Sequence, residues 1–196
     1  KALSTLLEAP IVTTYNGLAA IESSFKNLVG PRSRHGSEIS KAAIEEADCV
    51  IVVGSSLTAI STNRWELKAK NLIQFDIIPE NIGRHYPASV GIIGDAKVNL
   101  QLLTNELKAQ NYTADSSYRD EIFARKAKWA KGVFSGPIAD TQATPVPPIA
   151  LQMELGKCLK ENGIFVVDAG NPGAWAHITD FPEGTTCMKP VNYGNM

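Results

Sequence analysis

The chain has 196 residues, of which 44% are hydrophobic and 20% are charged, and its formal net charge at pH 7 is -1. This is the composition of a globular protein, and the charge balance gives no reason to expect a nucleic acid or an acidic membrane as a partner. No apolar run approaches the length needed to span a membrane, so we expect a soluble, cytoplasmic protein.

The spacing of cysteines and histidines predicts neither a disulfide framework nor a metal site. The cysteines are odd in number and form no CxxC pair. The histidines stand alone, without metal-ligand spacing or a paired carboxylate: His35, His85 and His177. We therefore assign surface or structural roles to these residues.

Strands and helices alternate through residues 1–131, which is typical of an α/β fold with a parallel sheet flanked by helices. The first eight residues are typical of the end of a helix, and residues 11–14 of a strand. Ser37 can cap a helix that extends to Ala47, because apolar residues recur there at helical spacing.

Further along the chain, three apolar runs are typical of strands buried on both faces: 48–54, 72–77 and 90–93. A helix follows the third run, and its periodicity places Val98, Leu102, Leu103 and Leu107 on the inward face. Residues 118–131 predict another helix.

The composition changes at residue 132. Residues 132–148 are rich in proline, glycine and small polar residues, which is typical of a linker. A helix at 149–161, an Asn-Gly turn and a buried strand at 164–167 then begin a second α/β unit. The predicted division is a domain at 1–131, a linker at 132–148 and a second domain at 149–196, each domain being incomplete at its chain end.

Ligands of open parallel sheets bind beyond the carboxyl ends of the strands. Three loops of this chain qualify, those after the strands at 48–54, 72–77 and 164–167. In the third loop, Gly170 and Gly173 permit unusual backbone angles. Each loop is weak evidence by itself, since a glycine after a strand is usually a plain turn and Asp95 is more often a helix cap than a ligand.

Five segments stand in a characteristic order: PIVTTYNG at 10–17, ADCVIVVG at 47–54, QFDIIPENIG at 74–83, GDA at 94–96 and VDAGN at 167–171. The first four resemble the middle domain of thiamine-diphosphate-dependent enzymes of the acetolactate synthase type. The fifth, after a tryptophan-bearing helix and a proline-rich linker, is similar to the entry into their diphosphate-binding domain. The resemblance covers nearly the whole chain and implies a Rossmann-like middle domain followed by the start of the cofactor-binding domain.

The resemblance implies a diphosphate-binding loop in the second unit. Ala169, Gly170, Asn171 and Pro172 match the loop whose backbone and side chains contact the cofactor's diphosphate. Acetolactate synthases have Gly-Gln-His in this loop, so Asn171 and Pro172 depart from their pattern.

A second cofactor contact is implied at the end of the sequence. Gly194, Asn195 and Met196 match the segment that meets the aminopyrimidine ring. By the same match, Met196 has a catalytic role as the bulky apolar residue that supports the bent cofactor.

The resemblance also implies parts that this sequence does not contain. The catalytic glutamate belongs to an N-terminal domain, magnesium is held by a segment after Met196, and the first strand of the middle domain precedes Lys1. We therefore expect a fragment that is inactive alone. The intact enzyme would be a dimer or tetramer that uses thiamine diphosphate and Mg²⁺ to decarboxylate a 2-oxo acid or form a C–C bond.

In some relatives the middle domain also binds FAD, in others ADP or nothing. The matching positions are Thr14, Tyr15, Gly54, Ser55, Asp76 and Asp95. Ser56 stands where flavin-binding synthases have arginine, and Ile78 replaces an aspartate of the family motif. FAD and a nucleotide fold without a ligand both stay open.

Two alternatives to acetolactate synthase chemistry remain. One is a sibling enzyme: a decarboxylase, a benzaldehyde-lyase-like enzyme or an acyltransferase of sulfonated aldehydes. The other is a non-catalytic nucleotide-binding module with the sirtuin-type fold that this middle domain resembles. The linker and the unit after it argue against a stand-alone module.

Overall fold

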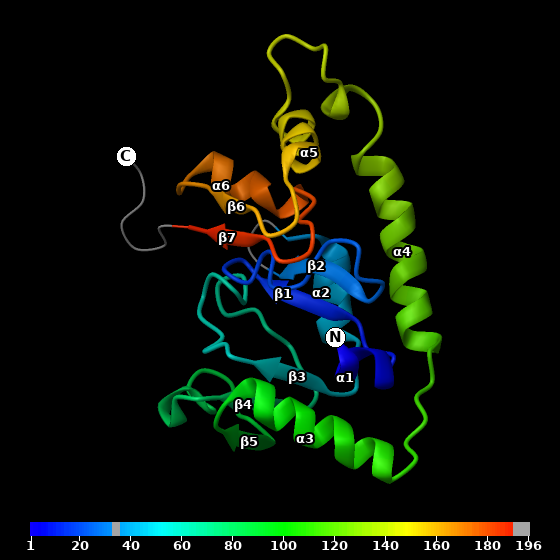
Figure 1. Ribbon diagram of the computed structural model, residues 1–196, viewed down its shortest axis with the longest axis vertical. Helices are drawn as coiled ribbons and strands as arrows, with labels where there is room; N and C mark the ends of the chain where they lie inside the picture. Colours follow the sequence, from blue (N-terminus) through cyan, green and yellow to red (C-terminus); the bar gives the residue numbers. More distant parts are fainter. Residues whose placement is uncertain (33–35, 190–196) are drawn as a thin grey trace.

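The structure, a computed structural model, describes residues 1–32 and 36–189 and has the α/β architecture predicted from the sequence (Figure 1). Within these residues the strands form three parallel sheets, with the orders β1-β2, β3-β4-β5 and β6-β7. In Figure 1 the sheet of β1 and β2 lies between the other two. No helix in the described part of the chain is long and apolar enough to cross a membrane.

The middle sheet consists of β1 (Ile11–Thr14) and β2 (Leu28–Arg32), and α2 (Glu38–Glu45) packs against it. As predicted, Ser37 caps α2, because its hydroxyl accepts a hydrogen bond of 3.1 Å from the amide of Ser40. The apolar faces of these elements and of the helix α4 form one core: Val29, Ile39, Ala42, Ala43 and Ile122.

The helix α4 (Ser117–Val133) runs along one side of the molecule (Figure 1). The side chain of Ile122 is fully buried in the core shared with α2. The hydroxyl of Tyr118 donates a hydrogen bond of 2.9 Å to the carbonyl of Ala43. The helix predicted in this region is therefore confirmed, and one face of it covers α2.

The second sheet consists of β3 (Val50–Val53), β4 (Leu72–Asp76) and β5 (Val90–Ile93). The prediction that all three strands are buried on both faces is wrong. Only the central strand β4 is largely buried, whereas Val53 is 41% exposed and Ile93 is 60% exposed. The central strand β4 is covered by α3, whereas β3 and β5 form the edges of this sheet, where less of each face is covered.

The helix α3 (Ala96–Ala109) packs against β4 and against α1 (Ala2–Leu6). Its predicted inward face is partly wrong, since Val98 and Leu102 are 57% and 60% exposed. The helix faces the protein through a narrow stripe in which Thr104 is buried. The apolar periodicity of the sequence therefore overestimates the width of the covered face.

Residues 134–147, within the predicted linker 132–148, connect α4 to the second unit and contain the short helix η2 (Pro137–Ala139). In the second unit, α6 (Asn171–Trp175) and η3 (Ala176–Ile178) follow β6.

The second unit begins with α5 (Pro148–Cys158), and its sheet pairs β6 (Ile164–Val166) with β7 (Thr186–Met188). The helix ends three residues earlier than the predicted boundary. The prediction of a buried strand holds for only one face of β6: Phe165 is buried, whereas Ile164 and Val166 are 67% and 70% exposed. Alternate residues of the strand face inward, so one face of the sheet is covered and the other is open.

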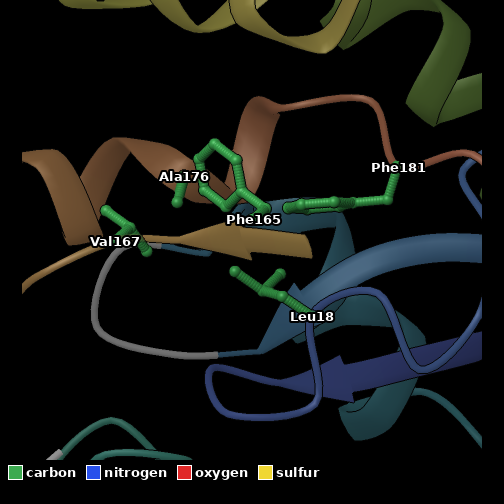
Figure 2. Close-up of a cluster of buried hydrophobic side chains, with 5 residues drawn as sticks. All are labelled: Leu18, Phe165, Val167, Ala176 and Phe181. Carbon is green, nitrogen blue, oxygen red and sulfur yellow. The ribbon is translucent and has the colours of Figure 1, made fainter. Parts of the chain in front are cut away.

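The two units share a hydrophobic cluster (Figure 2). Leu18 comes from the loop after β1, and the other members come from the second unit: Phe165, Val167, Ala176 and Phe181. The rings of Phe165 and Phe181 meet edge-on, with 5.5 Å between their centroids. Ser23 and Phe181 exchange two hydrogen bonds of 2.9 Å, one through the Ser23 hydroxyl. These contacts fix the loop after β1 against the second unit.

Candidate functional site

The loop after β6 is open to solvent where the sequence predicts a diphosphate contact. Gly170, Asn171 and Pro172 are exposed, and Ala169 is half-buried. Gly170 has a φ of 90°, and no described atom lies within 4 Å of a Cβ built on it. Such a loop can present backbone amides and the Asn171 side chain to an anionic group, so its residues fit a diphosphate.

Tyr15 directly follows β1, and its hydroxyl packs against Gly173 at the end of this loop. A Cβ built on Gly173 would lie 2.5 Å from the Tyr15 hydroxyl oxygen and 2.7 Å from the carbonyl oxygen of Asp168. Only glycine therefore allows this close packing of α6, the strand end and the tyrosine ring. Burial raises the pKa of the Tyr15 hydroxyl, and the neighbouring Cys187 adds to the shift.

Lys189, directly after β7, completes this group. Its ammonium nitrogen lies 3.4 Å from the centroid of the Tyr15 ring and donates a hydrogen bond of 3.1 Å to the Tyr15 carbonyl. Burial lowers the pKa of Lys189 to about 8. The sequence alone does not single out Lys189, because one lysine after a strand of three residues has no distinguishing pattern.

Two predicted nucleotide-contacting residues, Gly54 and Ser55, follow β3. Gly54 has a φ of 60°, and an added Cβ would meet no described atom within 4 Å. The Ser55 hydroxyl accepts a hydrogen bond of 3.3 Å from the Leu57 amide. The Ser55 carbonyl accepts one of 3.1 Å from the side chain of Gln74.

The two predicted carboxylates of the middle unit are held within their own loops. The buried carboxylate of Asp76 accepts hydrogen bonds from the Ile78 amide at 2.9 Å and the Asn81 side chain at 3.1 Å. Asn81 ends the short helix η1 (Pro79–Asn81). Asp95 caps α3 by accepting a hydrogen bond of 2.9 Å from the Val98 amide. Both carboxylates thus have structural partners, and their contact with a nucleotide stays a prediction.

The predicted site residues therefore fall into two groups on different sheets. Thr14 and Tyr15 end β1, and Tyr15 lies against the loop 168–172. The hydroxyl of Thr14 accepts a hydrogen bond of 3.1 Å from the Gly17 amide, which shapes the turn after β1. The other group, Gly54 to Asp95, lies at the carboxyl edge of the sheet β3-β4-β5.

Some predicted residues lie outside the part that the structure describes: His35, Gly194, Asn195 and Met196. In the described ranges, no cluster of three or more histidine, cysteine, aspartate or glutamate side chains could hold a metal ion. The magnesium prediction concerns a segment beyond Met196.

Comparison with known proteins shows the family of this chain through its first unit. The profile described as "Thiamine pyrophosphate enzyme, central domain" matches residues 1–103. The chain therefore belongs to the thiamine pyrophosphate enzyme family, as the sequence motifs predicted.

Individual relatives carry two kinds of name. The sulfoacetaldehyde acetyltransferase of Roseovarius nubinhibens is 33% identical, over 98% of this chain and 35% of that protein. The mitochondrial acetolactate synthase catalytic subunits of Aspergillus candidus and Saccharomyces cerevisiae are 28% and 24% identical, over 89% and 90% of this chain and 27% of each relative. The chain thus spans between 27% and 35% of the length of these relatives.

Proposed function

We propose that this chain is part of an enzyme that uses thiamine diphosphate and Mg²⁺ to decarboxylate a 2-oxo acid, to form a C–C bond, or both, as acetolactate synthases do. The observation that carries the proposal is the exposed loop 168–172 at the carboxyl end of β6, in a chain of this family. Carboxyl ends of parallel strands are where ligands of α/β folds bind.

Four residues would hold the cofactor here. The backbone of Ala169 and Gly170 and the side chain of Asn171 would face the diphosphate, and Pro172 would fix the first turn of α6. When bound, thiamine diphosphate supplies an electron sink for breaking a C–C bond next to a carbonyl. The task of these residues is to position the cofactor and to exclude water from one side of it.

A second candidate is an acetyltransferase that acts on sulfoacetaldehyde. It is favoured by the higher identity and fuller coverage of the Roseovarius nubinhibens relative, 33% over 98% of the chain against 28% over 89% for the Aspergillus candidus synthase. Both candidates would use the same proposed cofactor loop, and they differ in the bond that breaks: the C–C bond to the carboxylate in a 2-oxo acid, or the C–S bond to the sulfonate in sulfoacetaldehyde.

The test is a substrate comparison with the full-length protein. Pyruvate and sulfoacetaldehyde would be supplied separately, with and without thiamine diphosphate and Mg²⁺, and with inorganic phosphate present as an acetyl acceptor. Consumption of pyruvate with release of carbon dioxide supports the synthase, and consumption of sulfoacetaldehyde supports the acetyltransferase. If neither substrate is consumed and thiamine diphosphate does not bind, the proposal fails, and a non-catalytic module becomes the leading explanation.

We further propose that the intact enzyme is a homo-oligomer, a dimer or tetramer, and that FAD is an alternative ligand of the middle unit. For FAD the structural support is limited to the open space at Gly54, since the carboxylates of Asp76 and Asp95 are engaged in their own loops. Light scattering tests the first statement, and a flavin absorption spectrum of the purified protein tests the second.

A further inference from the structure

The ammonium group of Lys189 is a half-buried charge that has no acidic partner among residues 1–32 and 36–189. Within the described ranges, no carboxylate lies within the 4.0 Å of its nitrogen that would make a salt bridge. Its partners are the Tyr15 ring and the Tyr15 carbonyl. An ammonium has three donors, and the carbonyl uses one of them. A charge withdrawn from water in this way is costly unless an anion compensates it.

The two acidic groups beside Lys189 do not provide that anion. Burial raises the pKa of the Cys187 thiol above its ordinary value of 9.0, and burial also raises the pKa of the Tyr15 hydroxyl above 10.0. Both groups are therefore protonated at neutral pH. Neither Cys187 nor Tyr15 therefore compensates the positive charge of Lys189.

The position of Lys189 connects this charge to the candidate cofactor loop. The Tyr15 ring lies under the Lys189 ammonium, and the Tyr15 hydroxyl packs against Gly173, directly after the loop 168–172. The Tyr15 side chain thus lies between Lys189 and the residue that follows the loop 168–172. The carboxyl ends of β1, β6 and β7 meet around this tyrosine.

We propose that Lys189 binds an oxyanion at the carboxyl ends of β1, β6 and β7, and that Tyr15 positions the lysine for this contact. The oxyanion is a phosphate group of the cofactor or the acidic group of the substrate, which share the same chemistry. The inference rests on the proposed function for the identity of these two sources, but the presence of an oxyanion site does not depend on turnover.

The first test measures the site without requiring activity. The full-length protein is acetylated with acetic anhydride in the absence and presence of inorganic phosphate, thiamine diphosphate or pyruvate, and the rate at each lysine is read by mass spectrometry. We expect at least one anion to slow the labelling of Lys189 several-fold. Lys126 is the matched control: it is similarly buried and donates a 2.6 Å hydrogen bond to the Leu28 carbonyl, outside this group, so its rate should not change. Labelling of Lys189 that no anion slows would overturn the proposal.

The second test identifies the source of the anion with Lys189→Met, Lys189→Arg and the control Lys126→Met, each checked for folding by circular dichroism. A Lys189→Met variant whose thiamine diphosphate Kd rises about tenfold, equal to about 1.4 kcal/mol, assigns the anion to the cofactor. A rise in KM for the 2-oxo acid at unchanged cofactor Kd assigns it to the substrate. In either case Lys189→Arg should restore much of the loss.

The failures of the two proposals are distinguishable. A wild-type protein that turns over normally, with Lys189→Met leaving both Kd and KM unchanged, overturns the role of Lys189 alone. A wild-type protein that binds no thiamine diphosphate defeats the proposed function, and slowed labelling of Lys189 by phosphate would still establish the oxyanion site.

Discussion

At Gly173 the packing leaves no room for a side chain. A methyl group would meet the Tyr15 hydroxyl at 2.5 Å and the carbonyl of Asp168 at 2.7 Å, and one of these neighbours is backbone. We predict that Gly173→Ala lowers the free energy of unfolding of the full-length protein by about 1–3 kcal/mol, the usual cost of overpacking. Urea unfolding measures this change.

Gly132→Ala is the matched control for that substitution. Gly132 is exposed in α4, and an added Cβ meets no described atom within 4 Å, so alanine should stabilise the helix by about 0.5–1 kcal/mol. Combining Gly173→Ala with Tyr15→Phe should recover part of the loss. If Gly173→Ala were as harmless as Gly132→Ala, the packing of Tyr15 on α6 would be wrong.

The buried charge of Lys189 predicts a pH dependence of stability. Its pKa is lowered from 10.5 to about 8, so between these values the unfolded chain binds more protons at this residue than the folded chain does. The contribution of Lys189 to stability therefore rises with pH across that window and is least favourable below about pH 8. The Lys189→Met variant lacks this contribution to the pH dependence of stability.

The measurement is the difference in unfolding free energy between wild type and Lys189→Met in buffers free of oxyanions. We expect the unfolding free energy of wild type to increase relative to that of Lys189→Met as the pH rises from about 8 to about 10.5. The exposed Lys108→Met on α3 is the control and should show a smaller pH-dependent difference. A difference that is constant across this window would contradict the burial of the ammonium.

Residues of the candidate site differ in how far the sequence could predict them. Ala169 to Pro172 follow an apolar strand and carry a family motif, so their position at a strand end was predictable. Tyr15 was placed by motif among nucleotide-contacting residues, yet its ring packs on the other unit's loop. Lys189 carried no local signal, because its environment is created by β1 and β7 coming together, which is a tertiary event.

Among the elements, β4 carries a buried polar side chain, Gln74, that bonds to the loops on either side of it. Gln74 is 1% exposed, and its amide donates hydrogen bonds to the carbonyls of Ser55 at 3.1 Å and Asn81 at 2.9 Å. Its carbonyl oxygen accepts one of 2.9 Å from the amide of Gly83. Gln74 thus ties the loop after β3 to the loop after β4.

We predict that Gln74→Leu destabilises the protein by about 1–3 kcal/mol or more, because it leaves backbone groups without partners in a buried place. Thermal or urea unfolding tests this. Gln101→Leu on the exposed side of α3 is the control and should change stability by less than about 0.5 kcal/mol. Equal effects of the two substitutions would show that Gln74 does not join the two loops.

At the element scale the sequence predicted helices better than strand burial. Ser37 and Asp95 indicate where α2 and α3 begin, because an N-cap bonds an amide only three residues further along the chain. The strand β2 was missed, since Gly30 and Pro31 within it weaken any strand pattern. The exposure of β5 and β6 depends on which elements cover them, and a run of apolar residues does not contain that information.

The two units pack against each other in one hydrophobic cluster (Figure 2). Its members are Leu18 from the first unit and Phe165, Val167, Ala176 and Phe181 from the second. Phe181 is 4% exposed and also exchanges two hydrogen bonds with Ser23, so this residue of the second unit is bound to the first unit in two ways. We predict that Phe181→Ala costs about 3–5 kcal/mol and separates the unfolding of the two units. Differential scanning calorimetry should then resolve two transitions where wild type has one for this region.

Ile122→Ala is the control for the loss of a buried apolar side chain. Ile122 is fully buried within the first unit, between α4 and α2, so its truncation should cost about 2–5 kcal/mol without separating the units. If Phe181→Ala and Ile122→Ala had the same effect on the number of transitions, the cluster would not be the junction that couples the units.

The central claim is that the loop 168–172 holds thiamine diphosphate, and a calorimetric titration of the full-length protein with the cofactor in the presence of Mg²⁺ tests it most directly. We predict that wild type binds and that Asn171→Ala weakens binding by about tenfold, equal to about 1.4 kcal/mol, the scale of a lost hydrogen bond to a charged group. Asn105→Ala on the exposed side of α3 should leave the affinity unchanged. A wild-type protein that does not bind, or an Asn171→Ala variant that binds as wild type does, would contradict the assignment of this loop.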